Sequence, residues 1–300
     1  MQRVCTIGRA GPARSSPRAA ASGPAAGARH ACSLRQPEEH PIIDPPLEPL
    51  TVTGLSIVAG ERTLLQNLSL GVRHGEFLAI LGRNGSGKTL TLHALAGLNA
   101  AHRGRVLLDG EDLRSMPRRR IARRLGLLLQ DREESLALSA LESALIGRHP
   151  HLKFWQREDA QDMAIARAAL RRVGLADFSR RSVATLSGGE QRRAAMAALL
   201  TQQPQIYLLD EPTNHLDPHH QIEVLEVFRE LCREGASVVA TLHDPTLAER
   251  YADRALLLYG DGRYRLGPVA EVLTAEELSA LYLTPICAIG APPRRAFIAA

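Results

Sequence analysis

Lysine is scarce in this 300-residue chain. Only Lys88 and Lys153 occur, and every other member of the 37 basic residues is arginine. The preference for arginine over lysine accompanies a heavy use of alanine and leucine, which indicates a general compositional bias of the chain. The formal net charge of +5 is therefore weak evidence for a nucleic-acid partner. The same scarcity makes Lys88 informative, because few lysines exist to fall inside a motif by chance.

Cysteine is also scarce, and long apolar runs are missing. The four cysteines are scattered and form no C-x-x-C pair: Cys5, Cys32, Cys232 and Cys287. This spacing argues against a disulfide framework or a zinc site and fits a reducing compartment. No apolar run reaches the roughly 18 residues that a membrane-spanning helix needs. We therefore expect any membrane association to come through a partner.

The first 46 residues lack helical or strand periodicity and carry repeated proline and glycine. They also lack the continuous apolar stretch of a secretory signal. We interpret residues 1–46 as a disordered tail, or as translation from a start codon placed too far upstream. An arginine-rich transit peptide is the competing interpretation, which proline and glycine disfavour because they would break its helix.

Strand and helix patterns alternate along the rest of the chain. Strands are predicted at residues 50–58, 63–72, 77–81, 206–209, 237–242 and 255–259. Helices are predicted at residues 88–95, 138–146, 156–173, 191–200 and 219–233, with short helical pieces over 268–282. The alternation predicts a mostly parallel sheet with helices on both faces. The uninterrupted helical stretch in the middle predicts a helical lobe inserted into this α/β core.

A glycine-rich motif follows the apolar run at 77–81. Its sequence, GRNGSGKT, matches G-x-x-x-x-G-K-[ST], a loop whose backbone N–H groups cradle phosphates. The following helix start adds its positive end. Lys88 is expected to bridge the β- and γ-phosphates, and the Thr89 hydroxyl to ligate Mg²⁺. The predicted nucleotide-binding residues are Gly82, Arg83, Asn84, Gly85, Ser86, Gly87, Lys88 and Thr89.

A second apolar strand, residues 206–209, ends in the adjacent acids Asp210 and Glu211. Buried strands seldom end in paired carboxylates without a cation or a proton to handle. Asp210 is predicted to hold Mg²⁺, directly or through water. Glu211 is predicted to orient or deprotonate the water that attacks the γ-phosphate.

The stretch LSGGEQ, residues 186–191, resembles the signature sequence of the ATP-binding-cassette (ABC) ATPases. The resemblance covers about residues 50–285. It implies a P-loop NTPase core with a mostly parallel sheet, an antiparallel β subdomain and an inserted helical subdomain. The implied ABC ATPase domain is 47–286, with its helical subdomain at about 131–185, followed by a C-terminal tail over 287–300.

The resemblance also implies roles for residues outside the two motifs that bind phosphate and metal. Gln130 matches the glutamine that contacts Mg²⁺ and water and connects to the helical lobe. Asp217 matches the acid at the contact between two cassettes. His243 matches the switch histidine that touches the γ-phosphate. Gln130 and His243 therefore join Glu211 as expected catalytic residues.

The signature itself implies a partner. Ser187 and the backbone N–H groups of Gly188 and Gly189 form an anion-binding helix start. In the family, this start faces the γ-phosphate bound by the opposite subunit. The resemblance therefore implies a homodimer that ATP holds together and that hydrolysis releases.

The chain departs from the family pattern at Ala59. The family commonly places an aromatic residue there, which stacks on adenine. Without that stacking, worth roughly 1 kcal/mol, we predict weak discrimination between ATP and GTP.

Finer resemblance comes from GRHPH at 147–151 and LTAEELSALY at 273–282, which look like the importers of iron–siderophore, haem and cobalamin. It implies an ATP-hydrolysing subunit that powers uptake of a metal chelate. The implied partners are two separate transmembrane permease subunits and, through them, an extracytoplasmic substrate-binding protein. The implied location is peripheral, at the cytoplasmic face of the inner membrane.

Two other functions stay open. A soluble cassette protein could act in translation or DNA repair, although this chain has one cassette and no long insertion. A non-catalytic nucleotide switch is disfavoured by the presence of Glu211 and His243. An arginine cluster carries no interleaved aromatic residues and predicts a solvated helix face, not a nucleic-acid site. It consists of Arg118, Arg119, Arg120, Arg123 and Arg124.

Overall fold

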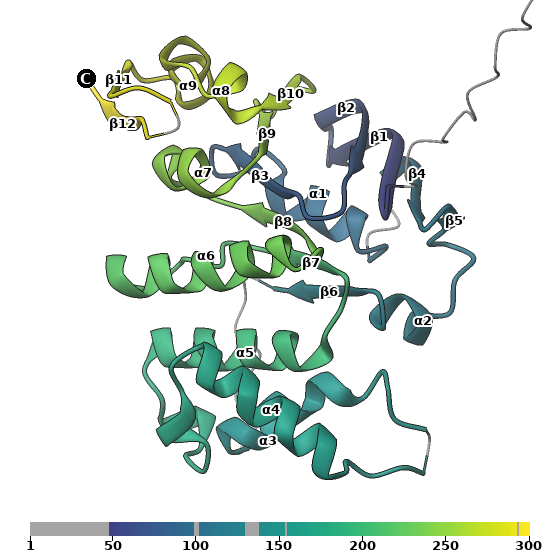
Figure 1. Cartoon of the computed structure of the whole chain (residues 1–300). Helices are drawn as coiled ribbons and strands as arrows, with labels where there is room; N and C mark the ends of the chain where they lie inside the picture. Colours follow the sequence, from purple (N-terminus) through teal and green to yellow (C-terminus); the bar gives the residue numbers. More distant parts are fainter. Residues whose placement is uncertain (1–47, 99–101, 130–137, 154, 293) are drawn as a thin grey trace, which may run out of the picture. The chain divides into compact units, whose positions relative to one another are not determined.

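The computed structural model describes residues 48–98, 102–129, 138–153, 155–292 and 294–300. Twelve strands are present in these residues (Figure 1). They are β1 (Leu50–Ala59), β2 (Arg62–Val72), β3 (Phe77–Gly82), β4 (His102–Leu108), β5 (Glu111–Asp112), β6 (Leu125–Leu128), β7 (Ile206–Leu209), β8 (Ser237–Thr241), β9 (Arg254–Leu258), β10 (Tyr264–Pro268), β11 (Ile286–Ile289) and β12 (Ala296–Ala299).

The helices alternate with the strands through most of the chain. They are α1 (Lys88–Leu95), α2 (Arg118–Ala122), α3 (Ala140–Leu145), α4 (Ala160–Arg172), α5 (Gly188–Gln202), α6 (Pro218–Arg233), α7 (Pro245–Tyr251), α8 (Val269–Val272) and α9 (Ala275–Tyr282). Among the described residues, no helix combines the length and the apolar character needed to cross a bilayer.

The central sheet has six strands in the order β10-β9-β3-β8-β7-β6. Five of them run parallel, and β10 pairs antiparallel with β9 at the edge. Parallel strands end at the same edge of a sheet, which is where open α/β sheets bind ligands. The segments after β3, β7 and β8 therefore leave the sheet side by side.

The sequence of β3 shows no alternation of polar and apolar residues, because the strand is buried on both faces. Phe77, Ala79 and Leu81 lie in a core that also contains residues of α5 and α6. Leu78 and Ile80 lie in a second core, which contains residues of β1, β2 and α1. Both faces of the sheet are covered, so every side chain of the strand is apolar.

A second sheet is antiparallel and has the order β2-β1-β4-β5. Helices α3 and α4 pack with α5 in a helical lobe, at the lower end of the view in Figure 1. Small side chains let these helices approach closely: Ala144, Ala166 and Ala197 are fully buried. The predicted fold class, a P-loop-type core with an antiparallel subdomain and a helical lobe, is confirmed by these layers.

Side-chain caps fix where the helices begin. Capping boxes at Ser139, Asp159 and Ser187 start α3, α4 and α5. Asp217 and Asp244, each followed by proline, start α6 and α7. The caps explain why α4 starts later than the predicted residue 156.

The segment 287–300 contains strands that the sequence analysis does not predict. β11 and β12 pair antiparallel, and Phe297 reaches the core. Arg295 donates to both carboxylate oxygens of the buried Glu249 on α7, at 2.8 and 2.9 Å. These contacts attach the expected tail to the cassette. The other expected tail, residues 1–46, lies outside the described residues, as do residues 131–137 of the expected helical subdomain.

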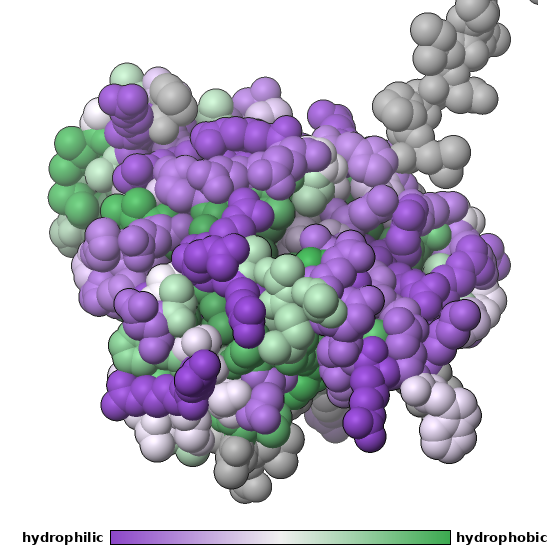
Figure 2. All heavy atoms as spheres, turned by 60° about the horizontal axis from the view of Figure 1, so that its bottom comes forward, coloured by the Kyte–Doolittle hydropathy of each residue, from purple (hydrophilic) through white to green (hydrophobic). Residues whose placement is uncertain are grey.

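Hydrophilic side chains dominate the face that Figure 2 turns forward, with smaller hydrophobic areas between them. In the arginine cluster around α2, Arg119 and Arg123 donate to the Pro150 carbonyl. Arg120 pairs with Glu111, and Arg124 pairs with Asp109. Four of the five arginines thus have partners within the protein, and the expected absence of a nucleic-acid partner stays a prediction.

Candidate active site

The glycine-rich loop joins β3 to α1, as its motif requires. Gly85 and Gly87 have φ of 75° and 98°, a left-handed conformation that favours glycine. Gly87 is the N-cap of α1 and supplies no side-chain hydrogen bond. A Cβ at Gly82 would lie 2.6 Å from the Leu258 carbonyl oxygen, so the loop also needs glycine at its start. The helix start is consequently open to an anion.

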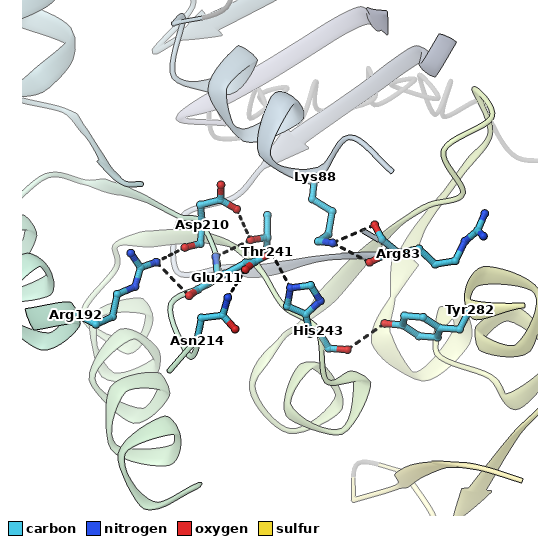
Figure 3. Close-up of polar contacts among 10 residues, drawn as sticks. Arg83, Lys88, Arg192, Asp210, Glu211, Asn214, Thr241, His243 and Tyr282 are labelled. Atoms are coloured by element: carbon cyan, nitrogen blue, oxygen red, sulfur yellow. Dashed lines mark hydrogen bonds and ion pairs between the residues drawn. The ribbon is translucent and has the colours of Figure 1, made fainter. Parts of the chain in front are cut away.

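Lys88 folds back over this loop. Its Nζ donates to the carbonyl oxygens of Gly82 at 2.9 Å and Arg83 at 3.2 Å (Figure 3). Burial lowers the pKa of Lys88, while the nearby charges of Glu211 and Asp210 act in the opposite direction. The amine is therefore placed beside the carboxylates and above the loop, where a phosphate would meet it.

Asp210 and Thr241 meet where two neighbouring strands end. β7 pairs in parallel with β8, with Leu209 opposite Ala240. The Thr241 hydroxyl donates to Asp210 Oδ1 at 2.7 Å and accepts from the Glu211 N–H at 2.7 Å. Thr241 orients both acids. The sequence analysis missed it, although a hydroxyl at the end of a strand flanking the acids was an available signal.

Two buried oxygen atoms at the site have no hydrogen-bond partner among the described residues: Asp210 Oδ2 and Ser86 Oγ. Buried polar atoms are normally paired. Hydroxyl and carboxylate oxygens are also the ligands that Mg²⁺ prefers. The Asp210 carboxylate therefore fits the predicted metal, and the Ser86 hydroxyl suits a phosphate. The other two predicted metal ligands are Thr89, in the first turn of α1, and Gln130, which lies outside the described residues.

Glu211 directly follows Asp210, and its carboxylate lies beside His243. Its Oε1 lies 2.6 Å from His243 Nε2, and Asn214 Nδ2 donates to its Oε2. Glu211 has φ of 48°, a left-handed conformation that is uncommon outside glycine. The structure thus brings together Lys88, Asp210, Glu211 and His243 (Figure 3). Such a carboxylate, held by two side chains beside a phosphate-binding loop, can act on a water molecule.

Two further contacts were missed by the sequence analysis. The Tyr282 hydroxyl donates to the His243 carbonyl oxygen at 3.2 Å, and burial raises the pKa of Tyr282. The Arg192 guanidinium donates to the carbonyl oxygens of Asp210 and Glu211. Both bonds end on backbone atoms, so no motif in the sequence reports them.

The signature residues lie at the start of α5. The Ser187 hydroxyl accepts from Glu190 N at 3.4 Å, and the Glu190 carboxylate accepts from Ser187 N at 2.7 Å. A Cβ at Gly189 would lie 3.3 Å from Leu216, in the segment that follows Glu211. Within the described part of the chain, no hydrogen bond joins Ser187, Gly188 or Gly189 to the phosphate loop.

Asp217 caps α6 and is exposed. Its Oδ1 accepts from His220 N at 3.0 Å, and its Oδ2 lies 2.7 Å from His220 Nδ1. These hydrogen bonds hold the pKa of Asp217 below its usual range. The capping contact is local and leaves the expected role at a cassette contact untested.

Ala59 ends β1 and is exposed beside the turn to β2. This hairpin lies near the loop, because a Cβ at Gly87 would lie 3.2 Å from the Leu64 Cβ on β2. The side chain of Ala59 offers no ring for stacking on a base.

The parallel sheet, the phosphate loop and the paired acids define a P-loop nucleoside triphosphatase. Residues 65–214 match the family described as ABC transporter. A hemin import ATP-binding protein, HmuV, from Deinococcus radiodurans is 43% identical over 238 residues, which cover 78% of this chain and 89% of that protein. The ferric enterobactin transport ATP-binding protein FepC from Escherichia coli is 37% identical, over 76% of this chain and 84% of that protein.

Other relatives extend the comparison. The cobalamin import ATP-binding protein BtuD from Halobacterium salinarum is 36% identical over 81% of this chain, which spans 61% of that protein's length. A solved structure described as a metal-chelate type ABC transporter in an inward-facing conformation superposes with a TM-score of 0.73 and 27% identity. The match covers 84% of this chain and 97% of that one. The chain belongs to the ABC transporter family and is an ATPase.

Proposed function

We propose that the chain is the ATP-hydrolysing subunit of an importer for a metal chelate: haem, a ferric siderophore or cobalamin. The observation that supports hydrolysis is the carboxylate of Glu211, held by His243 and Asn214 beside the phosphate loop. Import is supported by relatives named for hemin, ferric enterobactin and cobalamin.

The phosphate loop binds the triphosphate in this proposal. Backbone N–H groups between Gly82 and Thr89 surround the phosphates, and Lys88 exchanges its two carbonyl partners for phosphate oxygens. Asp210, Thr89 and Gln130 would hold Mg²⁺, which would neutralise charge on the β- and γ-phosphates. The unpartnered Asp210 Oδ2 supports this assignment.

Glu211 acts on the attacking water. Its carboxylate orients that water and accepts its proton, and His243 lies on the same carboxylate at 2.6 Å. In the proposed mechanism, His243 also contacts the γ-phosphate, which gives it two tasks. Thr241 keeps the backbone of Glu211 in place during the reaction through the 2.7 Å hydrogen bond to its N–H.

Two copies are required for a complete site. Among the described residues, no hydrogen bond joins the start of α5 to its own phosphate loop, which supports the use of Ser187, Gly188 and Gly189 by a second copy. We assign them to the γ-phosphate held by that copy, with Asp217 at the contact between the cassettes. ATP then stabilises the closed dimer, and hydrolysis shifts the population back to the open state.

The remaining partners follow from the importer assignment. The dimer binds two transmembrane permease subunits at the cytoplasmic face of the inner membrane, and the permease receives cargo from an extracytoplasmic substrate-binding protein. The ABC ATPase domain occupies 47–286 in this proposal, with 131–185 as the helical subdomain that contacts the permease. The relative named for hemin has the highest identity of the three reported, 43%, which makes haem the first cargo to test.

Uptake in a deletion strain of the source organism tests the proposal, with labelled haem, ferric siderophore and cobalamin measured in parallel. We expect loss of one uptake, restored by the intact gene and not by Glu211→Gln. The same variant should form an ATP-bound dimer in size-exclusion chromatography with ATP and Mg²⁺. Unchanged uptake of all three cargoes would contradict the importer assignment, and a variant that stays monomeric would contradict the dimer.

A further inference from the structure

Arg192 connects the signature helix to the ends of two strands. It lies on α5, a little more than one turn beyond Ser187. Its Nη1 donates to the Leu129 carbonyl, and its Nη2 donates to the carbonyls of Asp210 and Glu211, the last at 3.1 Å. Figure 3 shows the side chain reaching from the helix to both acids.

These three carbonyls belong to chain segments that have just left the sheet. β6 ends at Leu128 and β7 at Leu209, and the last ladder bond runs from Asp210 N to the Leu128 carbonyl. Beyond it, carbonyl oxygens need other donors. A guanidinium offers several N–H groups in one rigid plane, which suits acceptors that converge from two strands.

The position of Glu211 depends on its backbone. Its φ of 48° is a left-handed conformation that costs free energy for a non-glycine residue. Thr241 on β8 holds the N–H of Glu211, and Arg192 on α5 holds its carbonyl. The peptide groups on both sides of the Glu211 side chain are therefore held by hydrogen bonds.

We propose that Arg192 is a positioning residue, which ties the backbone of Glu211 and of Leu129 to the signature helix. This inference rests on the proposed function. In the proposed dimer, the start of α5 contacts the nucleotide held by the other copy. Arg192 then couples the two nucleotide sites of the dimer. The position of Glu211 beside the nucleotide of its own copy depends on whether the signature of the same copy has bound the nucleotide of the other copy.

The alternative is that Arg192 only stabilises strand ends. Arg193 provides the matched control, because it is the next residue of α5 and is also half-buried. Its Nη1 donates to the Val173 carbonyl at 3.2 Å, within the helical lobe. Arg193→Gln therefore removes the same charge from the same helix without touching the carbonyls of the two acids.

The experiment compares the full-length chain with Arg192→Gln and Arg193→Gln. It measures kcat, KM and the Hill coefficient for Mg-ATP hydrolysis, the ATP affinity without Mg²⁺, and Tm. We expect Arg192→Gln to lower kcat by about 10- to 100-fold, the size of effect that follows a small displacement of a catalytic group. Its Mg²⁺-free ATP affinity should stay within about threefold, and its Hill coefficient should fall toward one.

Arg193→Gln should keep kcat within about threefold at a similar Tm. If Arg192→Gln does not fold, Arg192→Lys replaces it, because lysine keeps the charge and lacks the planar fork. Equal kcat values in the two glutamine variants would overturn the positioning role while leaving the ATPase intact. An unmodified chain without ATP hydrolysis would instead overturn the proposed function, and the role of Arg192 with it.

Discussion

Two helix starts in this chain are rich in glycine, and they are capped in opposite ways. α1 follows Gly87, which supplies no side-chain cap, and its first turn contains no acid. α5 follows Ser187, which forms a capping box with Glu190, an acid in the first turn. The first start is open to an anion, whereas at the second the N–H groups of Ser187 and Glu190 already have acceptors within one chain.

The difference assigns separate tasks to the two starts. An uncapped start with a lysine beside it suits binding of a triphosphate by one chain. A capped start with an acid nearby binds an anion less strongly by itself, because the acid opposes the helix dipole's attraction for negative charge. The α5 start therefore suits a contact that forms only after another cassette has bound the nucleotide. Variants at each start test this division.

The largest expected effect is at the open start. Lys88→Ala should weaken ATP binding by about 100-fold, since charge-assisted hydrogen bonds to phosphate are worth roughly 1.5–3 kcal/mol each. Lys153→Ala is the control, because Lys153 is exposed and lies in the helical lobe. Titration calorimetry with the full-length chain measures both. A loss below about fivefold would show that the open start is not the main binding element.

The capped start should behave differently. Ser187→Ala should lower kcat about 10-fold while the ATP affinity of the single chain stays unchanged, because in the proposed dimer this start acts on the other copy's nucleotide. Ser139→Ala is its matched control, since the same capping box begins α3. Each variant should lose about 1 kcal/mol of stability. Matching kcat values at matching Tm would remove the catalytic role of Ser187.

A smaller effect is expected from base recognition at Ala59, at the end of β1. Ala59→Tyr should tighten ATP binding about fivefold by adding roughly 1 kcal/mol of stacking. The unmodified chain should bind ATP and GTP within about threefold of each other. Ala59→Leu controls for added apolar area. A strong preference for ATP in the unmodified chain would indicate that another residue contacts the base.

The smallest expected effect concerns the acid of the capped start. Glu190→Gln keeps the capping hydrogen bond and removes the charge, so the KM for ATP should fall about two- to threefold as repulsion of the phosphate is relieved. Glu142→Gln makes the same change in the α3 box and should leave KM unchanged. Initial-rate measurements at low ionic strength are the most sensitive test, and a rise in KM would reverse the argument.

The sequence predicted the parts of the site whose chemistry lies in contiguous residues. The phosphate loop and the two acids could be predicted because each directly follows an apolar strand in the sequence. Thr241, Arg192 and Tyr282 were missed, because each contacts a site residue that is distant in sequence, and Arg192 and Tyr282 do so through backbone carbonyls of that residue.

The fold shows the same limit. Long apolar or amphipathic segments such as β3 and α6 were predicted, whereas β4, β10 and α7 were not. The hairpin of β11 and β12 was missed because each strand has four residues and its stability comes from contacts with α7. Such pairing depends on tertiary packing, which local sequence patterns do not contain.

The environment of Lys88 has a consequence for chemical labelling. Lys88 and Lys153 are the two lysine side chains of the protein, one buried and one exposed. The lowered pKa of Lys88 leaves more of its amine neutral and nucleophilic at a given pH than an ordinary lysine would have. The ratio of acylated Lys88 to acylated Lys153, read by mass spectrometry, should therefore report how often the phosphate loop is covered by nucleotide.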